Sequence, residues 1–297
     1  MKPLIKTTVS YQPTKILRLV LSRINRSIAR KNINNNPQLI IFSFDHIGLS
    51  VNLDGRYENS ELMLLEQFIK EKMPNSHKDT ALDIGANIGN HSVFLSKFFN
   101  RVYSFEPNPI TYDVLSLNSK YAAPRKNIIP YNIGLSDKDD QLPFTIIPNN
   151  IGASKIESSD VDRKSNSNII YINVKKADKI NSLQIENISL IKIDIEGHEV
   201  NALKGAEKII KSNKPVILFE QGAKEVRKSS SEVIEYLSSL NYSFYTIRKR
   251  FYFGESFVCK LFGILLRSLF GEQLSFVETT HFDKRFYDMI LAIQNDK

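Results

Sequence analysis

Acidic side chains of this chain follow apolar stretches at points where a ligand could reach them. Asp83 ends one such stretch and begins a glycine turn that reads Asp83-Ile-Gly85-Ala-Asn87-Ile-Gly89. Glu106 ends the next stretch. Because glycine has no Cβ, Gly85 and Gly89 allow a ligand to approach the backbone closely. We expect the Glu106 carboxylate to accept hydrogen bonds from a ribose diol, as a carboxylate does at this place in nucleotide-binding βαβ units.

The residue before the turn indicates which kind of nucleotide would bind. Dinucleotide-binding turns follow the pattern G-x-G-x-x-G and leave the helix N-terminus free for a pyrophosphate. Here the acidic Asp83 precedes glycines that are spaced differently. A carboxylate would repel a pyrophosphate, whereas it suits a cationic ligand such as the sulfonium of S-adenosylmethionine. The alternative is an ordinary strand, turn and helix without a ligand.

A second acidic stretch, Lys192-Ile-Asp194-Ile-Glu196-Gly-His198, ends a later apolar strand. Alternation with isoleucine places Lys192, Asp194 and Glu196 on one face of that strand. Charged groups at that depth need partners or solvent, which a cleft supplies. A structural ion pair explains Lys192 equally well, whereas Asp194 and Glu196 are candidates for function. Magnesium takes one or two carboxylates and waters, so two carboxylates alone leave a divalent metal open and unsupported.

A parallel sheet would bring these residues together. From Thr80 onward, strand-like and helix-like stretches alternate, which predicts an α/β fold with a Rossmann-like, mostly parallel sheet and helices on both faces. We expect strands near 80–84, 101–106, 127–132, 189–195, 215–220, 242–247 and 287–293. We expect helices near 89–99, 109–120, 199–212 and 229–240. Extended stretches at 142–147 and 169–174 flank a polar loop at 149–168, which is a candidate substrate wall or lid.

The N-terminal arm, residues 1–36, holds the excess positive charge of the chain. It contains eight of the 40 Lys and Arg residues and none of the 32 Asp and Glu residues, so the net charge of +8 lies on the arm. A nucleic-acid enzyme more often spreads basic charge around its cleft, which counts against nucleic-acid binding. At about 100° per residue, residues 15–30 separate into an apolar and a basic face. Such a helix contacts a membrane surface or a partner, or it packs on its own protein.

Two further segments lie outside the alternating pattern. Residues 38–55 contain strand-like residues around a turn at 46–48 and predict a hairpin, which is followed by a helix over 61–72. Residues 250–284 form an insertion whose apolar centre is too short and too charged to span a bilayer. An interfacial helix, a dimer contact, a pocket wall or a helix packed on the core would each explain that centre.

The composition indicates a soluble globular protein without a transmembrane helix, since 42% of the residues are hydrophobic and no long apolar run occurs. The single Cys259 excludes an internal disulfide framework and a cysteine zinc site. The arginines of the arm interrupt the uncharged region that a secretory signal needs. We therefore expect a cytoplasmic protein, which the basic arm would bring to the membrane surface.

The chain resembles the FkbM family of S-adenosylmethionine-dependent methyltransferases over roughly residues 80–220. The matching blocks are Leu82–Gly89, Phe105–Pro109 with Leu115 and Asn118, Gly134–Asp137, Ile191–Gly197 with Glu199, Leu203–Ala206 and Pro215–Glu220. The resemblance implies a class I methyltransferase fold. It also implies methyl transfer, most often to a hydroxyl of a sugar or of another small or lipid-linked acceptor, and it does not name the acceptor.

The resemblance further implies roles for single residues. The methionine end of the cofactor would contact Asp83, Gly85, Asn87 and Gly89. Glu106 would bind the ribose hydroxyls, and Ser136 and Asp137 would border the adenine. Asn108 and Asn118 either join them or hold the local turn and helix. From the sequence as a whole we expect a basic arm at 1–36, a hairpin and helix at 37–79, and a cofactor-binding methyltransferase domain at 80–297 that carries the 250–284 insertion; the arm and the insertion lie outside the resemblance.

Methyl transfer to an alcohol calls for a group that removes the acceptor proton. The candidates are Asp194, Glu196, His198 and, in the insertion, His281. Histidine titrates in the range best suited to this task, although position 198 is not a fixed part of the family motif. His91, at the start of the first helix of the domain, is expected to pack or cap there. The choice among the candidates and the oligomeric state stay open.

Two other functions also stay open at this point. An N-methyltransferase or a nucleic-acid methyltransferase would use the same cofactor fold. No Asn-Pro-Pro-Tyr-like segment follows the fourth strand, where amino-methylating DNA enzymes carry one, which disfavours that class. A non-catalytic protein would retain the cofactor fold and use the basic arm to dock on a membrane or partner. We favour O-methylation of a hydroxyl-bearing acceptor.

Overall fold

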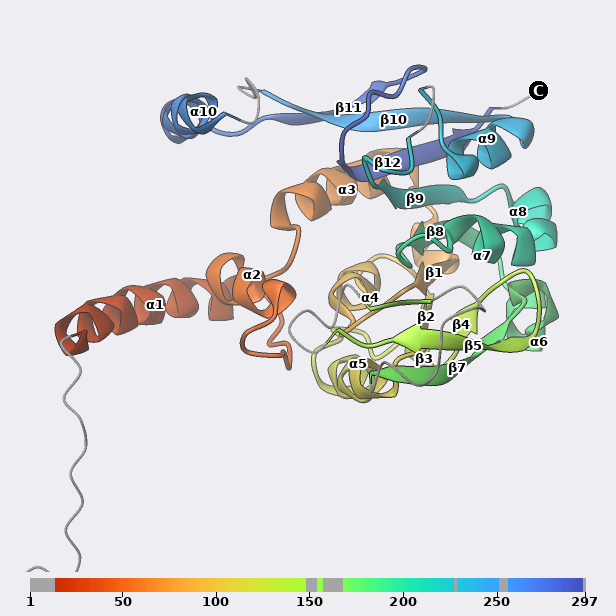
Figure 1. Ribbon diagram of the computed structural model, residues 1–297, viewed down its shortest axis with the longest axis horizontal. Helices are drawn as coiled ribbons and strands as arrows, with labels where there is room; N and C mark the ends of the chain where they lie inside the picture. The colour runs from red at the N-terminus through yellow and green to blue at the C-terminus, as the bar shows by residue number, and fades with distance from the viewer. Residues whose placement is uncertain (1–13, 148–153, 157–167, 227–228, 251–255, 296–297) are drawn as a thin grey trace, which may run out of the picture.

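The computed structural model describes residues 14–147, 154–156, 168–226, 229–250 and 256–295. Its α-helices are α1 (Lys15–Asn35), α2 (His46–Asp54), α3 (Asn59–Lys72), α4 (Asn90–Leu95), α5 (Pro109–Tyr121), α6 (Asn181–Gln184), α7 (Glu199–Gly205), α8 (Glu207–Asn213), α9 (Glu232–Ser239) and α10 (Phe257–Phe270). Its strands are β1 (Thr80–Ile84), β2 (Arg101–Phe105), β3 (Ile128–Tyr131), β4 (Gly134–Leu135), β5 (Asp140–Thr145), β6 (Lys155–Ile156), β7 (Ile169–Lys175), β8 (Ile188–Ile193), β9 (Val216–Gln221), β10 (Tyr242–Lys249), β11 (Leu274–Glu278) and β12 (Tyr287–Gln294). Figure 1 shows an α/β body from which α1 and α10 extend at one end.

Eight strands form one sheet in the order β11-β10-β12-β9-β8-β1-β2-β3. The strands from β9 to β3 pair in parallel, whereas β12, β10 and β11 pair antiparallel with their neighbours. The predicted Rossmann-like, mostly parallel sheet is thereby confirmed. The chain runs outward from β1 to β2 and β3 and then crosses to β8 on the other side of β1. Open α/β sheets bind ligands at such a switch point, outside the carboxyl ends of the strands.

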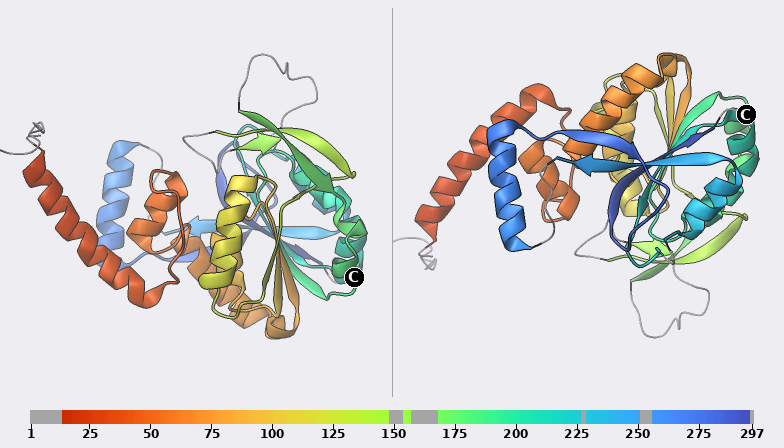
Figure 2. Two further views of the ribbon diagram at one scale, coloured as in Figure 1. Left: turned by 90° about the horizontal axis from the view of Figure 1, so that it is seen from below. Right: turned by 90° about the horizontal axis from the view of Figure 1, so that it is seen from above.

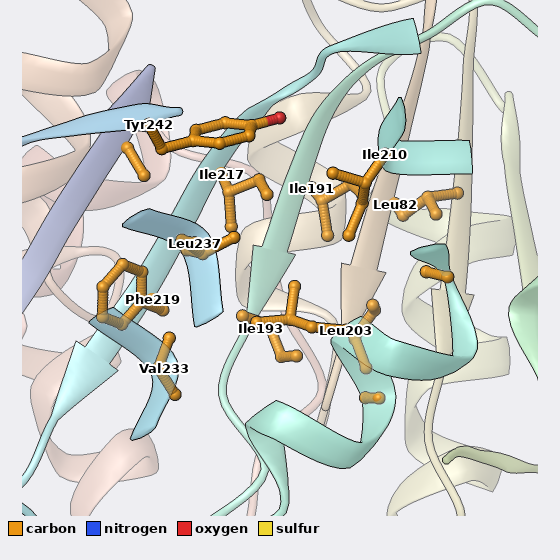
Figure 3. Packing of buried hydrophobic residues seen from close by; sticks show 14 of the residues in the cluster. Leu82, Ile191, Ile193, Leu203, Ile210, Ile217, Phe219, Val233, Leu237 and Tyr242 are labelled. Atoms are coloured by element: carbon orange, nitrogen blue, oxygen red, sulfur yellow. The ribbon is translucent and has the colours of Figure 1, made fainter. Parts of the chain in front are cut away.

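Strand residues alternate between two apolar layers, one on each face of the sheet. On one face, Leu82 and Ile191 belong to a core that α7, α8 and α9 complete, part of which is shown in Figure 3. On the other face, Ala81 and Leu190 belong to a core that α3 and α4 complete. A sheet that is covered on both faces requires apolar residues in both registers. This packing holds the carboxyl ends of β1 and β8 side by side.

A second, four-stranded sheet has the order β4-β7-β5-β6. Its strands β5 and β7 agree with the extended stretches predicted at 142–147 and 169–174. Phe144, Ile172 and Val174 form its small core. Of the polar loop at 149–168, only residues 154–156 and 168 are described, so the predicted substrate wall or lid lies otherwise outside the described residues.

The hairpin predicted for 38–55 is wrong, because α2 occupies the second half of that segment and neither half contains a strand. The Asp45 carboxylate caps this helix by accepting from the Ile47 N–H at 3.2 Å. Gly55 ends the helix with a φ of 84°. A side-chain cap at one end and a left-handed glycine at the other outweigh the strand-like composition between them. The helix predicted over 61–72 is confirmed as α3.

Two predicted helices differ in their bounds. The helix expected at 89–99 is shortened to α4, and the one expected at 199–212 is divided into α7 and α8. The division arises because the Asp178 carboxylate accepts from the N–H groups of Lys208 and Ile209, at 2.9 and 3.1 Å. These bonds cap a new helix N-terminus beside Ala206.

Helix α1 buries none of its residues, so the alternative in which its apolar face packs on the body is wrong. Its C-terminal end is held on α2, where the Asn32 side chain donates to the carbonyls of Asn52 and Leu53, at 3.4 and 3.1 Å. Both views of Figure 2 show α1 and α10 at the same end of the molecule. No helix among the described residues is long and apolar enough to cross a membrane.

Candidate active site

The turn after β1 lies at the switch point and touches the end of β8. Gly85 has a φ of 76° and Asn87 a φ of 50°. A Cβ at position 85 would lie 1.8 Å from the Asp194 carbonyl oxygen, so the close approach of the two strand ends requires glycine. The N–H groups of Gly85 and Ala86 both donate to the Phe105 carbonyl at 3.0 Å. These bonds fix the turn beside the ends of β1, β2 and β8.

Glu106, directly after β2, holds the turn through its carboxylate. Oε2 accepts from the Asn87 N–H at 2.9 Å, and Oε1 accepts from the Asn108 N–H at 2.9 Å and from the Thr111 hydroxyl at 3.3 Å. Burial raises the pKa of Glu106 to about 7, although these hydrogen bonds oppose the shift. A carboxylate has about four acceptor positions. One therefore remains for a further donor, such as a ribose hydroxyl.

The first cavity lies against this turn. Its polar lining side chains are Asn87, Glu106, Thr111, Ser154, Asp194 and Glu196, and Gly85 lines it as well. Its apolar lining includes Phe105 and three residues of the small sheet, Leu135, Phe144 and Ile156. Ligand sites combine an apolar lining with a few polar groups that fix orientation. Acceptors on one part of the lining and an aromatic and aliphatic surface on another fit a nucleoside.

An ion network, made of the buried Asp83 and Lys192 and the partly exposed Asp194, lies beside the turn. Lys192 pairs in register with Asp83, and its Nζ lies 3.6 Å from Asp83 Oδ1 and 3.4 Å from Asp194 Oδ2. Nζ also donates to the Gly85 carbonyl at 3.1 Å. Burial alone would lower the pKa of Lys192, but Asp194 and Asp83 outweigh burial and raise it. The ion-pair explanation of Lys192 is confirmed.

A second cavity adjoins the first. The two cavities share Gly85, Asn87, Asp194 and Glu196. The rest of the second lining includes His46 and Ile47 of α2 together with Tyr57, His91, Lys192 and Glu220. The second cavity is also lined by Asn90 and by the apolar Ala86 and Ile88. Its carboxylates, imidazoles and Lys192 suit a polar ligand with hydroxyl groups.

Two carboxyl groups and a histidine are linked at the second cavity. His91 Nε2 lies 3.0 Å from Glu58 Oε2, and Glu58 in turn bonds the Glu220 side chain. Burial, followed by Asp194 and Glu58, raises the pKa of Glu220. Burial would also raise the pKa of Glu58, but the hydrogen bond and charge of His91 lower it. The two carboxyls therefore share one proton at neutral pH.

Sequence reasoning missed Glu58 and assigned His91 to packing or capping. No local pattern marks Glu58, which precedes α3 with a φ of 53°. His91 lies two residues after Gly89, in the first turn of α4. Its closeness to the glycine turn is the signal that could have placed it at the site. Glu220, the last residue of the matching block Pro215–Glu220, lines the second cavity.

The structure brings together some of the predicted cofactor and catalytic residues. Asp194 and Glu196 line both cavities, as do Gly85 and Asn87. Asp83 is fully buried in the ion network and is not among the lining residues of either cavity. Gly89 acts at the start of α4 with a φ of 91°, and Glu106 lines the first cavity.

The other predicted residues form a separate group. His198 Nε2 lies 2.9 Å from the Ser136 hydroxyl, which bonds Asp137 at 3.1 Å. Burial lowers the pKa of His198. Burial would raise the pKa of Asp137, but hydrogen bonds from Asn201 and Ser136 lower it. None of these residues lines either of the two cavities, although Leu135, next to Ser136, lines the first.

Four polar residues singled out in the sequence have structural partners instead. Asn108 caps α5, and Asn118 joins the glycine turn to the segment before α2. Glu199 accepts from two N–H groups of the turn at 195–197. His281 contacts a serine hydroxyl and does not line either cavity.

The described part of the chain fits a cationic nucleoside better than a metal ion. The ion network carries two carboxylates against one ammonium, so it favours a positive ligand nearby. Asp83 Oδ1 is buried without a hydrogen-bond donor, and Glu106 has an acceptor position to spare. Among the described residues, no group of three or more His, Cys, Asp or Glu side chains is arranged to hold a metal ion.

Comparison with known proteins gives a family match and two curated relatives. A family model described as the methyltransferase FkbM domain matches residues 83–244. Hexuronic acid methyltransferase AglP of Haloferax volcanii is 32% identical over 158 residues, which cover 52% of this chain and 62% of the relative. Methyltransferase sdnD of Sordaria araneosa is 28% identical over 158 residues, which cover 42% of this chain and 60% of that relative. The matched part thus spans about three-fifths of each curated relative.

Among solved structures, a methyltransferase FkbM from Methylobacillus flagellatus is 17% identical. The match covers 94% of this chain and 60% of that one, with a TM-score of 0.43. A score of this size does not support a comparison of individual site residues. The family match rests on the chain itself, since it begins at Asp83 and includes Glu106, Asp194 and Glu220. Because the matched region makes up more than half of the sequence, the chain belongs to the FkbM methyltransferase family.

Proposed function

We propose that the protein is an S-adenosylmethionine-dependent O-methyltransferase that acts on a hydroxyl of a sugar or of another small or lipid-linked acceptor. The observation that carries the proposal is the pair of cavities that share Gly85, Asn87, Asp194 and Glu196. A group transfer needs donor and acceptor in adjoining sites, with their reacting atoms held close together. The relative whose name describes hexuronic acid methylation supports a sugar as the acceptor.

We assign the first cavity to the cofactor, which supplies a methyl group activated by its sulfonium when bound. Glu106 accepts from the ribose hydroxyls, and Gly85 and Asn87 border the methionine end. Asp83 acts through Lys192, and Gly89 acts through the start of α4. Ser136 and Asp137 remain proposed neighbours of the adenine, since they come directly after Leu135 in the sequence and Leu135 lines the first cavity.

We assign the second cavity to the acceptor. Burial, followed by the charge of Asp194, raises the pKa of Glu196, which brings this carboxyl closer to the range of an effective base at neutral pH. Glu196 takes the proton of the reacting hydroxyl. Asp194, oriented by Lys192 at 3.4 Å, accepts from a neighbouring hydroxyl of the same acceptor. His198, which bonds Ser136 at 2.9 Å, is the second candidate for the base.

Calorimetry with the full-length chain tests the cofactor assignment. We expect heat on titration with S-adenosylhomocysteine and none with NAD. Glu106→Ala should weaken S-adenosylhomocysteine binding by about tenfold or more, the effect of one lost hydrogen bond to a charged group. Glu66→Ala is the matched control, because Glu66 pairs with Lys70 on the surface of α3. Heat with NAD, or unchanged affinity in Glu106→Ala, would refute the assignment.

A methyl-transfer screen over cell-envelope glycan fractions, with labelled cofactor, tests the acceptor assignment. On the first acceptor found, Glu196→Gln should lower kcat by about 10²- to 10⁴-fold and leave S-adenosylhomocysteine affinity unchanged. His198→Ala should leave kcat nearly unchanged. The reverse pattern would make His198 the base, and transfer to a nitrogen or a nucleic acid would replace the hydroxyl acceptor.

We keep the division into an arm at 1–36, a segment at 37–79 and a methyltransferase domain at 80–297 as a proposal. The arm is supported by the exposure of α1. In the second segment, α3 contributes to the core that covers one face of the sheet. We therefore expect deletion of 1–36 to leave the fold intact and deletion through residue 72 to destabilise it.

A further inference from the structure

Helix α10 carries an exposed apolar face. Eight of its apolar side chains are more than half exposed, and six of them form one face: Phe257, Val258, Leu261, Ile264, Leu265 and Leu269. At about 100° per residue they fall within an arc of roughly 140°, in which Ser268 is the one polar residue. Gly263, the buried residue among those described in this helix, lies nearly opposite the middle of the arc. The apolar face is therefore turned away from the body of the protein.

An apolar surface of this kind is uncommon on a soluble monomer and indicates a binding partner. The helix begins with a side-chain cap, since the Ser256 hydroxyl accepts from the Cys259 N–H at 3.3 Å. It ends where Gly271 adopts a φ of 78°. Both ends are thus defined locally, which keeps the helix formed without a core beneath it.

Helix α1 adds positive charge at the same end of the molecule, as the two views of Figure 2 show. Its side chains Ile16, Val20 and Ile24 are at least half exposed. The basic face carries Lys15, Arg18, Arg23, Arg26 and Arg30, and residues 1–36 contain no acidic residue. Exposed apolar and basic faces together are typical of helices that lie at a membrane interface.

The positive charge of α1 favours an anionic bilayer over a second copy of the chain as the partner of this surface. A second copy of the chain would bring an equally basic α1 toward the first, and no acidic residue of the arm would offset the repulsion. An anionic bilayer offers acyl chains for α10 and negative headgroups for α1. We propose that α10 and α1 together dock the protein on an anionic lipid bilayer, with the apolar face of α10 inserted at the boundary of headgroups and acyl chains.

Helix α2 connects this docking surface to the second cavity. It holds α1 through the bonds of Asn32 to the carbonyls of Asn52 and Leu53, and its residues His46 and Ile47 line the cavity. A docked bilayer would therefore lie on the side of the molecule where α2 is placed. This favours an acceptor carried on a lipid, a consequence that rests on the proposed function, whereas membrane docking itself does not.

Vesicle sedimentation of the full chain tests the proposal without any acceptor or cofactor. We expect the protein to sediment with vesicles of phosphatidylcholine and phosphatidylglycerol, to remain largely in solution with phosphatidylcholine alone, and to be released by salt. Leu261→Asp with Leu265→Asp should lower the partition by at least about tenfold. Arg18→Glu, Arg23→Glu and Arg26→Glu together should remove the preference for the anionic lipid.

Matched variants elsewhere on the surface serve as controls. Ile185→Asp replaces a side chain that is 83% exposed and should sediment like the wild type. Lys126→Glu, Lys175→Glu and Lys204→Glu together reverse three exposed charges outside both helices and should keep most of the binding. Circular dichroism confirms that each variant is folded.

Two outcomes would overturn the proposal. The first is a wild-type protein that stays in solution with anionic vesicles, or an α10 variant that sediments as well as the wild type. The second is a lipid-free dimer in analytical ultracentrifugation that Leu261→Asp with Leu265→Asp dissociates, which would give the surface to a second copy. If the wild type does not bind anionic vesicles but still transfers methyl groups, the docking proposal fails and the proposed function stands.

Discussion

Glu106 allows the cofactor site to be tested before the acceptor is known. Its carboxyl is buried, and burial raises its pKa from the ordinary 4.5 to about 7. In the unfolded chain the same carboxyl is exposed to water and titrates near its ordinary pKa. Between these two values the folded protein keeps a proton that the unfolded chain releases. Glu106 therefore contributes stability that is complete below pH 4.5 and is lost as the pH rises through about 7.

The two pKa values give the size of the effect. Each pH unit between them corresponds to about 1.4 kcal/mol, so the contribution of Glu106 to the free energy of unfolding falls by about 2.5 kcal/mol from pH 5 to pH 8. Glu106→Gln removes the titration. The amide also leaves one backbone N–H, of Asn87 or of Asn108, without an acceptor, but that loss is the same at every pH. The destabilisation caused by Glu106→Gln should thus be about 2.5 kcal/mol smaller at pH 8 than at pH 5.

Urea unfolding followed by circular dichroism at pH 5, 6, 7 and 8 measures this difference. Glu66→Gln, on the surface of α3, is the control and should not change the pH dependence. Parallel pH profiles of the wild type and Glu106→Gln would refute the argument. Since ribose hydroxyls would donate to the carboxylate, the affinity of the wild type for S-adenosylhomocysteine should also fall as the pH drops below about 7.

Three further substitutions test the packing and the charges around the site. Gly205→Ala would place a Cβ 1.9 Å from the Ser136 carbonyl oxygen and should lower the free energy of unfolding in urea by about 1–3 kcal/mol; wild-type stability would contradict that close approach. Glu220→Gln should change the free energy of unfolding at pH 7 by less than about 0.5 kcal/mol, because Glu220 is already protonated. Glu58→Gln removes the charge paired with His91 and should destabilise the protein more. Equal losses of unfolding free energy in the two variants would contradict the shared proton.

The parts of the fold that sequence predicts well are those with buried, regular patterns. The apolar runs beside Asp83, Glu106 and Asp194 are strands covered on both faces. The strands β2 and β8 end directly before Glu106 and Asp194, whereas β1 includes the buried Asp83 and ends at Ile84. Adjacent parallel strands then bring these ends together. The positions of Asp194 and Glu196 beside Gly85 follow from that geometry.

The parts that sequence could not predict depend on single caps or on distant contacts. Residues 38–55 have the composition of strands, and only the cap at Asp45 and the positive φ of Gly55 select the helix. Glu58 carries no local signal, because its role depends on His91 and Glu220, which come from other parts of the chain. His198 is suited to catalysis by residue type, but its Nε2 is bonded to the Ser136 hydroxyl and the residue does not line either cavity.

The ion network of Asp83, Lys192 and Asp194 has a consequence for turnover. Two carboxylates and one ammonium leave one net negative charge at the cofactor end of the site. A sulfonium cofactor carries one net positive charge and brings the local sum to zero, whereas the spent, uncharged thioether product leaves the negative charge uncompensated. Methyl transfer would thus weaken the attraction for the product that it creates. The discrimination between fresh and spent cofactor would then be a property of the buried Asp83 and Lys192 and the partly exposed Asp194, and high salt should weaken it only in part, because buried charges are screened poorly.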